Sequence, residues 1–251
     1  MRKKRTLRRL DAELDETRIV PRSGGVYQLC GSGRSGKSMR AYAEAWAALA
    51  LMEGEFVHWI DGATRFNPAR VMQCFPENVP ESNTLLRNLF VGRGFTVHQF
   101  ASLVERLDGE LKITGARLVV VDGPITMHLD PQVKEREART LLRRCMDRLN
   151  QVAVKNNISV IVITESTPNS KRHSSLLQTV ERRCNQRLLG RIERSRGKNK
   201  MWLLHFPSGC SGFRKEVVEQ ETLEQSFSRV LHNELVYNRG LHEEVDLIAL
   251  D

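Results

Sequence analysis

The segment Gly31-Ser-Gly-Arg-Ser-Gly-Lys-Ser38 matches the pattern GxxxxGK[ST] of a phosphate-binding loop, or P-loop. An apolar run at residues 26–30 precedes it and an alanine-rich stretch at residues 39–52 follows it, so the loop joins a predicted strand to a predicted helix. Glycines in such a loop let backbone N–H groups turn toward phosphates at a helix N-terminus. The segment therefore predicts a nucleoside triphosphate site, with ATP as the expected ligand, formed by Gly31, Ser32, Gly33, Arg34, Ser35, Gly36, Lys37 and Ser38.

Three side chains have specific roles in a site of this kind. The Lys37 ammonium is expected to neutralise the β- and γ-phosphates, and the Ser38 hydroxyl to bind Mg²⁺. The apolar run at residues 118–121 ends at Asp122, as in a buried strand that presents one carboxylate beside the metal. We therefore expect ATP and Mg²⁺ as cofactors, with Ser38 and Asp122 as metal ligands.

Short apolar runs alternate with longer amphipathic stretches along the rest of the chain, which is typical of a parallel sheet with crossover helices. Strands are predicted at residues 26–30, 56–60, 89–91, 118–121, 159–164 and 201–206, and helices at residues 39–52, 97–107 and 133–156. Residues 166–187 are polar and lack a clear period, so we predict mostly loop there. The expected fold class is α/β, with a central, largely parallel β-sheet flanked by helices.

Composition excludes several classes of protein. A chain of 251 residues that is 40% hydrophobic suffices for one compact domain. No apolar stretch reaches the roughly 18 residues of a membrane helix, and acidic residues follow the basic N-terminus where a signal peptide would be apolar. The five cysteines are scattered without a CxxC pair, which indicates neither a disulfide framework nor a zinc site. We expect a soluble, intracellular protein that has no membrane partner.

The net charge of +9 is concentrated in two segments. The first ten residues carry six basic and no acidic side chains, and residues 171–200 carry ten basic against two acidic ones. The remainder of the chain is therefore net acidic. This asymmetry favours two local sites for a polyanion, and the alternative is a solvated tail and a solvated loop.

The order and spacing of the motifs resemble those of the RecA/RadA recombinases and of the paralogues of the eukaryotic strand-exchange recombinase. The resemblance covers nearly the whole chain from Leu7 onward. Five stretches carry it: Gly24-Gly-Val-Tyr-Gln-Leu-Cys-Gly31, Trp59-Ile-Asp-Gly-Ala-Thr-Arg-Phe-Asn-Pro-Ala-Arg70, Asn88-Leu-Phe-Val-Gly-Arg93 with His98-Gln99, Val121-Asp122, and Val160-Ile-Val-Ile-Thr164. It implies a RecA-type ATPase core at residues 21–251, preceded by a basic N-terminal arm and lead-in at residues 1–20.

The resemblance also implies roles for individual residues. Arg70 matches the arginine that stacks on the adenine, in line with the affinity of a planar guanidinium for π faces. Ser166 matches the polar sensor of the γ-phosphate, and the preceding Glu165 replaces the usual amide. Two DNA-facing loops are expected at residues 126–134 and 167–186. The candidate DNA-binding residues in and next to the second loop are Lys171, Arg172, Arg182, Arg183 and Arg187.

Three features depart from the full recombinases. The chain is expected to lack their small helical N-terminal domain, and no phenylalanine of the kind that docks on a neighbouring subunit precedes the P-loop. Ala63 stands where a catalytic carboxylate is expected, two residues after Asp61. Loss of a general base slows phosphoryl transfer, unless Glu165 or a carboxylate from a partner takes its place. We therefore expect ATP to be bound and to be hydrolysed slowly or not at all.

The leading hypothesis is a recombinase paralogue that acts as an accessory or mediator factor in homologous recombination and DNA repair. Its expected partners are other recombinase paralogues or the filament of the main recombinase, and single-stranded DNA. A nuclear location is expected if the source is eukaryotic, and otherwise the cytoplasm or nucleoid. Two alternatives remain open: a hexameric helicase-like or KaiC-like motor or signalling ATPase, and a nucleotide-locked scaffold that binds only proteins.

Overall fold

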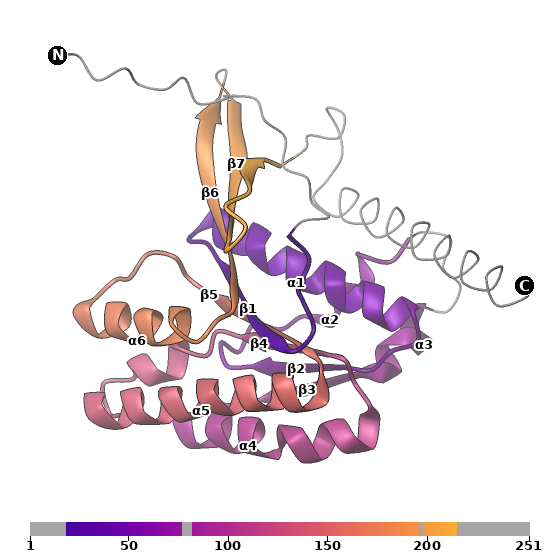
Figure 1. Cartoon of the computed structure of the whole chain (residues 1–251), viewed down its shortest axis with the longest axis horizontal. Coiled ribbons are helices and arrows are strands. Elements are labelled where there is room, and N and C mark those ends of the chain that lie inside the picture. Colours follow the sequence, from indigo (N-terminus) through magenta and orange to yellow (C-terminus); the bar gives the residue numbers. More distant parts are fainter. Residues whose placement is uncertain (1–18, 77–81, 196–197, 215–251) are drawn as a thin grey trace, which may run out of the picture.

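One sheet organises the molecule. The computed structural model describes residues 19–76, 82–195 and 198–214, whose strands form an eight-stranded sheet in the order β3-β2-β4-β5-β1-β6-β7-β8 (Figure 1). The strands from β3 to β6 in this order pair in parallel, whereas β7 pairs antiparallel with both β6 and β8. The strands are β1 Gly25–Cys30, β2 Val57–Asp61, β3 Leu89–Arg93, β4 Leu118–Asp122, β5 Ser159–Thr164, β6 Gln186–Ser195, β7 Lys198–Phe206 and β8 Ser211–Phe213. The predicted α/β class with a largely parallel sheet is confirmed.

Helices cover both faces of the sheet (Figure 1). They are α1 Arg34–Met52, α2 Pro68–Met72, α3 Ser82–Leu85, α4 Val97–Thr114, α5 Glu135–Asn156 and α6 Lys171–Glu181, with the 3₁₀ turns η2 Leu86–Asn88 and η3 Thr126–Leu129. Because successive strand residues point to opposite faces, Val120 and Ile161 pack with α1, while Val119 and Val160 pack with α4, α5 and α6. Burial on both faces explains why the central strands β4 and β5 are nearly continuous apolar runs.

The carboxyl ends of the parallel strands bring distant residues to one edge of the sheet. The last residue of β2, Asp61, lies opposite Asp122 at the end of β4. Asp122 in turn lies opposite Ile163 of β5, and Cys30 at the end of β1 lies opposite Thr164. The residues directly after these four strands therefore gather at one edge of the sheet, where ligands bind in open α/β sheets.

The prediction of mostly loop at residues 166–187 was wrong. The segment contains α6, and β6 begins at Gln186. The Ser170 hydroxyl caps α6 by accepting a hydrogen bond from the His173 N–H. Residues at helical spacing in α6 are buried, namely His173, Leu176, Leu177 and Val180. A polar histidine at the first of these positions obscured the apolar stripe, and burial within the tertiary structure stabilises the helix all the same.

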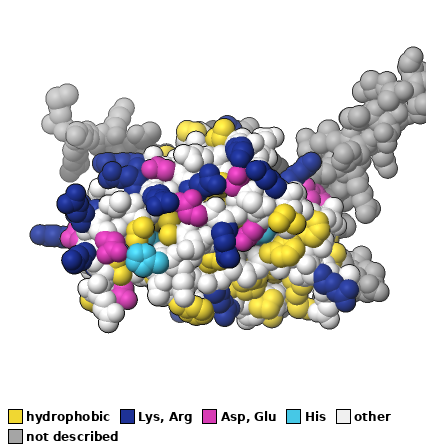
Figure 2. All heavy atoms as spheres, turned by 90° about the horizontal axis from the view of Figure 1, so that it is seen from below, with side chains coloured by type: hydrophobic (Ala, Val, Ile, Leu, Met, Phe, Trp, Pro, Cys, Tyr) yellow, Lys and Arg dark blue, Asp and Glu magenta, His cyan; other side chains and the backbone are white. Residues whose placement is uncertain are grey.

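The outer surface of the helical layer is mixed in charge. Viewed from the side of α4 and α5, lysine and arginine side chains are interleaved with aspartate and glutamate (Figure 2). Examples are the pairs Arg139–Glu135 and Arg144–Glu105. Among the helices that the structure describes, none is both long and apolar enough to cross a membrane. Of the predicted arm and lead-in, residues 1–18 lie outside the described residues, and Ile19 is buried in the core.

Candidate nucleotide-binding site

The P-loop sequence lies between β1 and α1, as predicted, but more of it is helical than the sequence indicated. Helix α1 begins at Arg34 and not at residue 39, with Gly33 as its N-cap at φ +58°. A Cβ on Gly31 would lie 2.8 Å from the Ser35 carbonyl carbon, so only glycine fits beneath this first turn. Lys37 is exposed. The loop therefore presents the free N–H groups of a helix N-terminus, which favour an anion.

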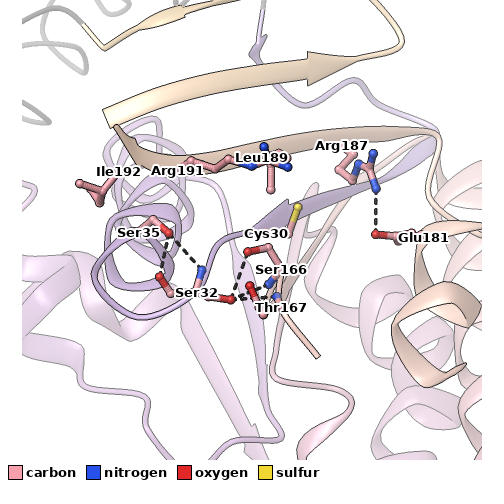
Figure 3. A pocket seen from close by; sticks show the side chains of 11 residues that line it. Cys30, Ser32, Ser35, Ser166, Thr167, Glu181, Arg187, Leu189, Arg191 and Ile192 are labelled. Atoms are coloured by element: carbon pink, nitrogen blue, oxygen red, sulfur yellow. Dashed lines mark hydrogen bonds and ion pairs between the residues drawn. The ribbon is translucent and has the colours of Figure 1, made fainter. Parts of the chain in front are cut away.

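Serine hydroxyls hold the P-loop against the end of β5 (Figure 3). The Ser35 hydroxyl donates to the Ser32 carbonyl at 2.8 Å and accepts from the Ser32 N–H at 3.0 Å. The Ser32 Oγ accepts from the Ser166 and Thr167 N–H groups at 3.1 and 2.9 Å, and lies 3.1 Å from the Ser166 Oγ. The structure thus brings Ser166, the predicted γ-phosphate sensor, into contact with the loop.

A cavity of about 590 Å³ opens beside these hydroxyls (Figure 3). Strand β6 contributes Arg187, Leu189 and Arg191 to its wall. Arg187 donates to Glu181 at 2.8 Å, which leaves its charge largely compensated. Burial raises the pKa of the Cys30 thiol to about 12, so this wall residue is neutral at physiological pH.

Asp122, the predicted metal ligand, is fully buried and ion-paired with Arg65. The Arg65 Nε lies 3.0 Å from Oδ1 and 3.2 Å from Oδ2, and its Nη2 lies 2.5 Å from Oδ1. Burial by itself would lower the pKa of Arg65, but the hydrogen bonds and charge of Asp122 outweigh it and raise that pKa. Arg65 therefore stays charged and covers both carboxylate oxygens.

The ion pair of Arg65 with Asp122 does not fit the expected Mg²⁺ site. Carboxylate and hydroxyl oxygens are suitable ligands for the ion, and the sequence supplies both in Asp122 and Ser38. The Asp122 oxygens, however, accept hydrogen bonds from Arg65, and the Ser38 hydroxyl donates to the Arg34 carbonyl within α1 at 3.2 Å. Asp122 is thus engaged by a contact within the protein, whereas the Ser38 oxygen, which only donates its proton, keeps its lone pairs available for a cation.

A tight turn after β2 positions Arg65 and places Ala63. The buried Asp61 carboxylate accepts hydrogen bonds from the backbone N–H groups of Ala63, Arg65 and Phe66 at 3.2, 3.2 and 2.9 Å. A Cβ built on Gly123 would lie 2.5 Å from the Ala63 Cβ. Ala63 thus packs against the backbone that follows Asp122, and its methyl group offers no proton acceptor where the family carboxylate is expected.

Arg70 on α2 is connected to Asp122 by a series of ion pairs. Its Nη1 lies 3.7 Å from Glu44 Oε1, and the Arg40 Nε lies 3.4 Å from the same oxygen. The Arg40 Nη1 lies 3.8 Å from Asp122 Oδ2. Burial raises the pKa of Glu44, and the charges of Arg40 and Arg70 oppose that rise. The predicted adenine-stacking residue is therefore linked to the predicted metal ligand through two side chains of α1.

Glu165 lines a cavity together with Arg65. It is exposed, and it lines with Arg65, Thr126 and His173 a small cavity of about 110 Å³. The charge of Glu165 helps to raise the pKa of Arg65. The structure thus places Glu165, the catalytic candidate, in the same cavity as the Arg65 guanidinium, whose charge attracts it.

The five candidate DNA-binding residues fall into two groups. Lys171 and Arg182, at the two ends of α6, are exposed. The other three make contacts within the protein: Arg172 donates to the His128 carbonyl at 2.5 Å, Arg183 to Asp147 at 2.7 Å and Arg187 to Glu181 at 2.8 Å. The cationic surface is therefore smaller than the sequence count indicated.

Sequence reasoning missed Arg65, Arg40 and Glu44. Arg65 lies within a stretch that carries the family resemblance, yet no local signal links it to Asp122. Arg40 and Glu44 are four residues apart on the helix behind the P-loop, a spacing that places two side chains on one helix face. From this spacing, the proximity of Arg40 and Glu44 could have been predicted.

A P-loop between β1 and α1, together with an aspartate at the end of a buried parallel strand, defines a P-loop protein of the RecA type. The Rad51 family model matches residues 19–184, and the chain belongs to that family. Membership places it among the recombinase-type proteins of DNA recombination and repair, which typically use ATP and Mg²⁺ and bind single-stranded DNA and other recombinase proteins. A search of the curated proteins gave no match.

Proposed function

We propose that this protein is an accessory paralogue of the strand-exchange recombinase, which binds ATP as a structural or switching ligand and hydrolyses it slowly or not at all. It acts on the main recombinase and its filament on single-stranded DNA. ATP occupies the P-loop from Gly31 to Ser38, with Arg70 against the adenine and Ser166 toward the γ-phosphate.

The observation that carries this proposal is the turn at Ala63. The P-loop sequence is intact, whereas the position of the catalytic carboxylate holds a methyl group packed against Gly123. Positioning of the attacking water is one of the few roles left to a side chain in phosphoryl transfer. Nucleotide binding without turnover suits a subunit whose bound state is read by a partner, and it disfavours a hexameric motor.

Two surfaces support the expected partners. Strand β3 forms one edge of the sheet, and no described strand pairs with its outer side. Phe90 and Val91 on this strand are each 42% exposed, and unpaired apolar edges are common protein-binding sites. The exposed cations Lys171 and Arg182 on α6 suit the phosphate backbone of DNA.

The test is a strand-exchange assay with the main recombinase of the same organism. Addition of this protein with ATP should raise the yield or stabilise the recombinase on single-stranded DNA against salt. The Lys37→Ala variant should lose this effect, and the Lys112→Ala variant, altered on the distant α4, should retain it. If the wild-type protein leaves both yield and filament stability unchanged, an accessory role is refuted.

A further inference from the structure

Arg65 covers the carboxylate that a metal ion would need. Asp122 is fully buried, and each of its two oxygens has an Arg65 nitrogen within 3.2 Å. Mg²⁺ requires oxygen ligands at about 2.0–2.1 Å in near-octahedral geometry, so direct coordination by these oxygens would require the guanidinium to move away. A planar bidentate pair of this kind is among the strongest hydrogen-bonded contacts in proteins.

Hydrogen bonds to Asp61 hold the backbone around Arg65. Asp61 ties down the turn through the N–H groups on both sides of Thr64. Thr64 has φ +54°, a left-handed conformation that a β-branched residue adopts only when its surroundings impose it. The turn is therefore preorganised, and it places Arg65 where its guanidinium reaches Asp122.

The buried carboxylates of the site already have guanidinium groups as counter-charges. Three guanidinium groups, those of Arg40, Arg65 and Arg70, are shared by two buried carboxylates, those of Glu44 and Asp122. The charges of Asp61 and Glu165 also act on Arg65, and Arg93 pairs with Asp61, so guanidinium groups and carboxylates balance at this site. Addition of a divalent cation beside three guanidinium groups is electrostatically unfavourable.

We propose that Arg65 takes the place of the divalent cation in this site, so that the protein binds a nucleoside triphosphate without a requirement for Mg²⁺. The guanidinium neutralises Asp122, so this buried carboxylate needs no metal ion as a counter-charge. The site should bind the free nucleoside triphosphate as well as its magnesium complex. This inference rests on the proposed function, because it assumes that the P-loop binds ATP.

The test compares the dissociation constant of ATP, measured by calorimetry on the full chain, in excess MgCl₂ and in excess EDTA at matched ionic strength. For the wild-type protein the two constants should agree within about threefold. For Arg65→Met, which exposes the Asp122 oxygens to a metal ion, binding should become at least about tenfold tighter in MgCl₂ than in EDTA. Arg117→Met, an exposed arginine remote from the site, should behave as the wild type.

A second variant covers the case in which Arg65→Met fails to fold. Arg65→Met combined with Asp122→Asn removes both charges of the buried pair, and its two dissociation constants should again agree within about threefold. A wild-type protein that binds ATP more than about tenfold tighter with Mg²⁺ overturns the inference and leaves the proposed function standing. An Arg65→Met protein that folds and shows no preference for Mg²⁺ overturns the role of Arg65. Absence of ATP binding under both conditions refutes the proposed function itself.

Discussion

Lys37 is the residue on which nucleotide affinity should depend most. Its side chain is exposed, so Lys37→Ala should abolish ATP binding and leave thermal unfolding nearly unchanged. The reason is that the ammonium serves the phosphates and not the fold. Lys112→Ala, which removes an exposed lysine of α4, is the matched control. A Lys37→Ala protein with an affinity within about threefold of wild type would contradict this role.

Ala63 sets the expected rate of hydrolysis. A methyl group neither orients nor deprotonates water, and loss of a general base costs about 10²–10⁴-fold in rate. Steady-state turnover of the isolated protein should therefore lie below roughly 1 s⁻¹. Glu165→Gln should not lower it further, because Glu165 lines the same cavity as Arg65, whose charge attracts its carboxylate. Turnover above roughly 1 s⁻¹ that persists in Glu165→Gln would refute slow hydrolysis, and its loss in that variant would make Glu165 the base.

Helix α6 carries the prediction about DNA at the scale of an element. Alanine at both Lys171 and Arg182 should weaken binding to single-stranded DNA, because both cations are exposed at the ends of the helix. The slope of log affinity against log salt should become shallower by about 0.7 for each phosphate that the variant no longer neutralises.

The matched control lies on the same segment. Arg183 and Arg187 have the same charge but are ion-paired with Asp147 and Glu181, so their double alanine variant should change the salt dependence much less. Binding should be measured by fluorescence anisotropy over a series of salt concentrations, with the partner recombinase present. If the slope of log affinity against log salt is the same for the two double variants, the exposed cations contact DNA no more than the ion-paired ones, and the prediction is wrong.

At the scale of the whole molecule, His128 makes stability depend on pH. It is fully buried, its Nδ1–H donates to the Pro124 carbonyl at 2.8 Å, and Nε2 has no hydrogen-bond partner among the described residues. Burial lowers the pKa of His128 to about 4 in the folded protein, opposed by its hydrogen bond to Pro124 and assisted by the charge of Arg172, against about 6.5 in an unfolded chain. The unfolded state therefore binds the proton more readily, and stability falls as pH drops below about 6.5.

The expected loss between pH 7.5 and pH 5 is about 2 kcal/mol from this one group. His128→Gln, which keeps a donor for Pro124 but does not titrate, should lose correspondingly less over the same interval. Urea unfolding of both proteins at the two pH values measures the difference. Should the variant lose as much stability as the wild type, protonation of other groups would be responsible.

The main features of the fold were predictable from the sequence because their causes are local. A parallel strand covered on both faces must be a continuous apolar run, so β1, β4 and β5 were found close to their observed bounds. The P-loop was likewise evident, since its glycines and Lys37 are contiguous. The start of α1 at Arg34 and the helix α6 were missed, because packing and not the local pattern determines them.

The sequence alone determined the buried strands, the phosphate loop, Asp122 at a strand end and the absence of a carboxylate at Ala63. Only the tertiary structure decided which charges meet. Arg65 and Asp122 are 57 residues apart and come together because β2 pairs with β4. In the same way, packing of α6 beside α5 gave Arg183 its partner Asp147. Side-chain pairing across a sheet edge or between helices depends on long-range contacts, and no local spacing encodes it.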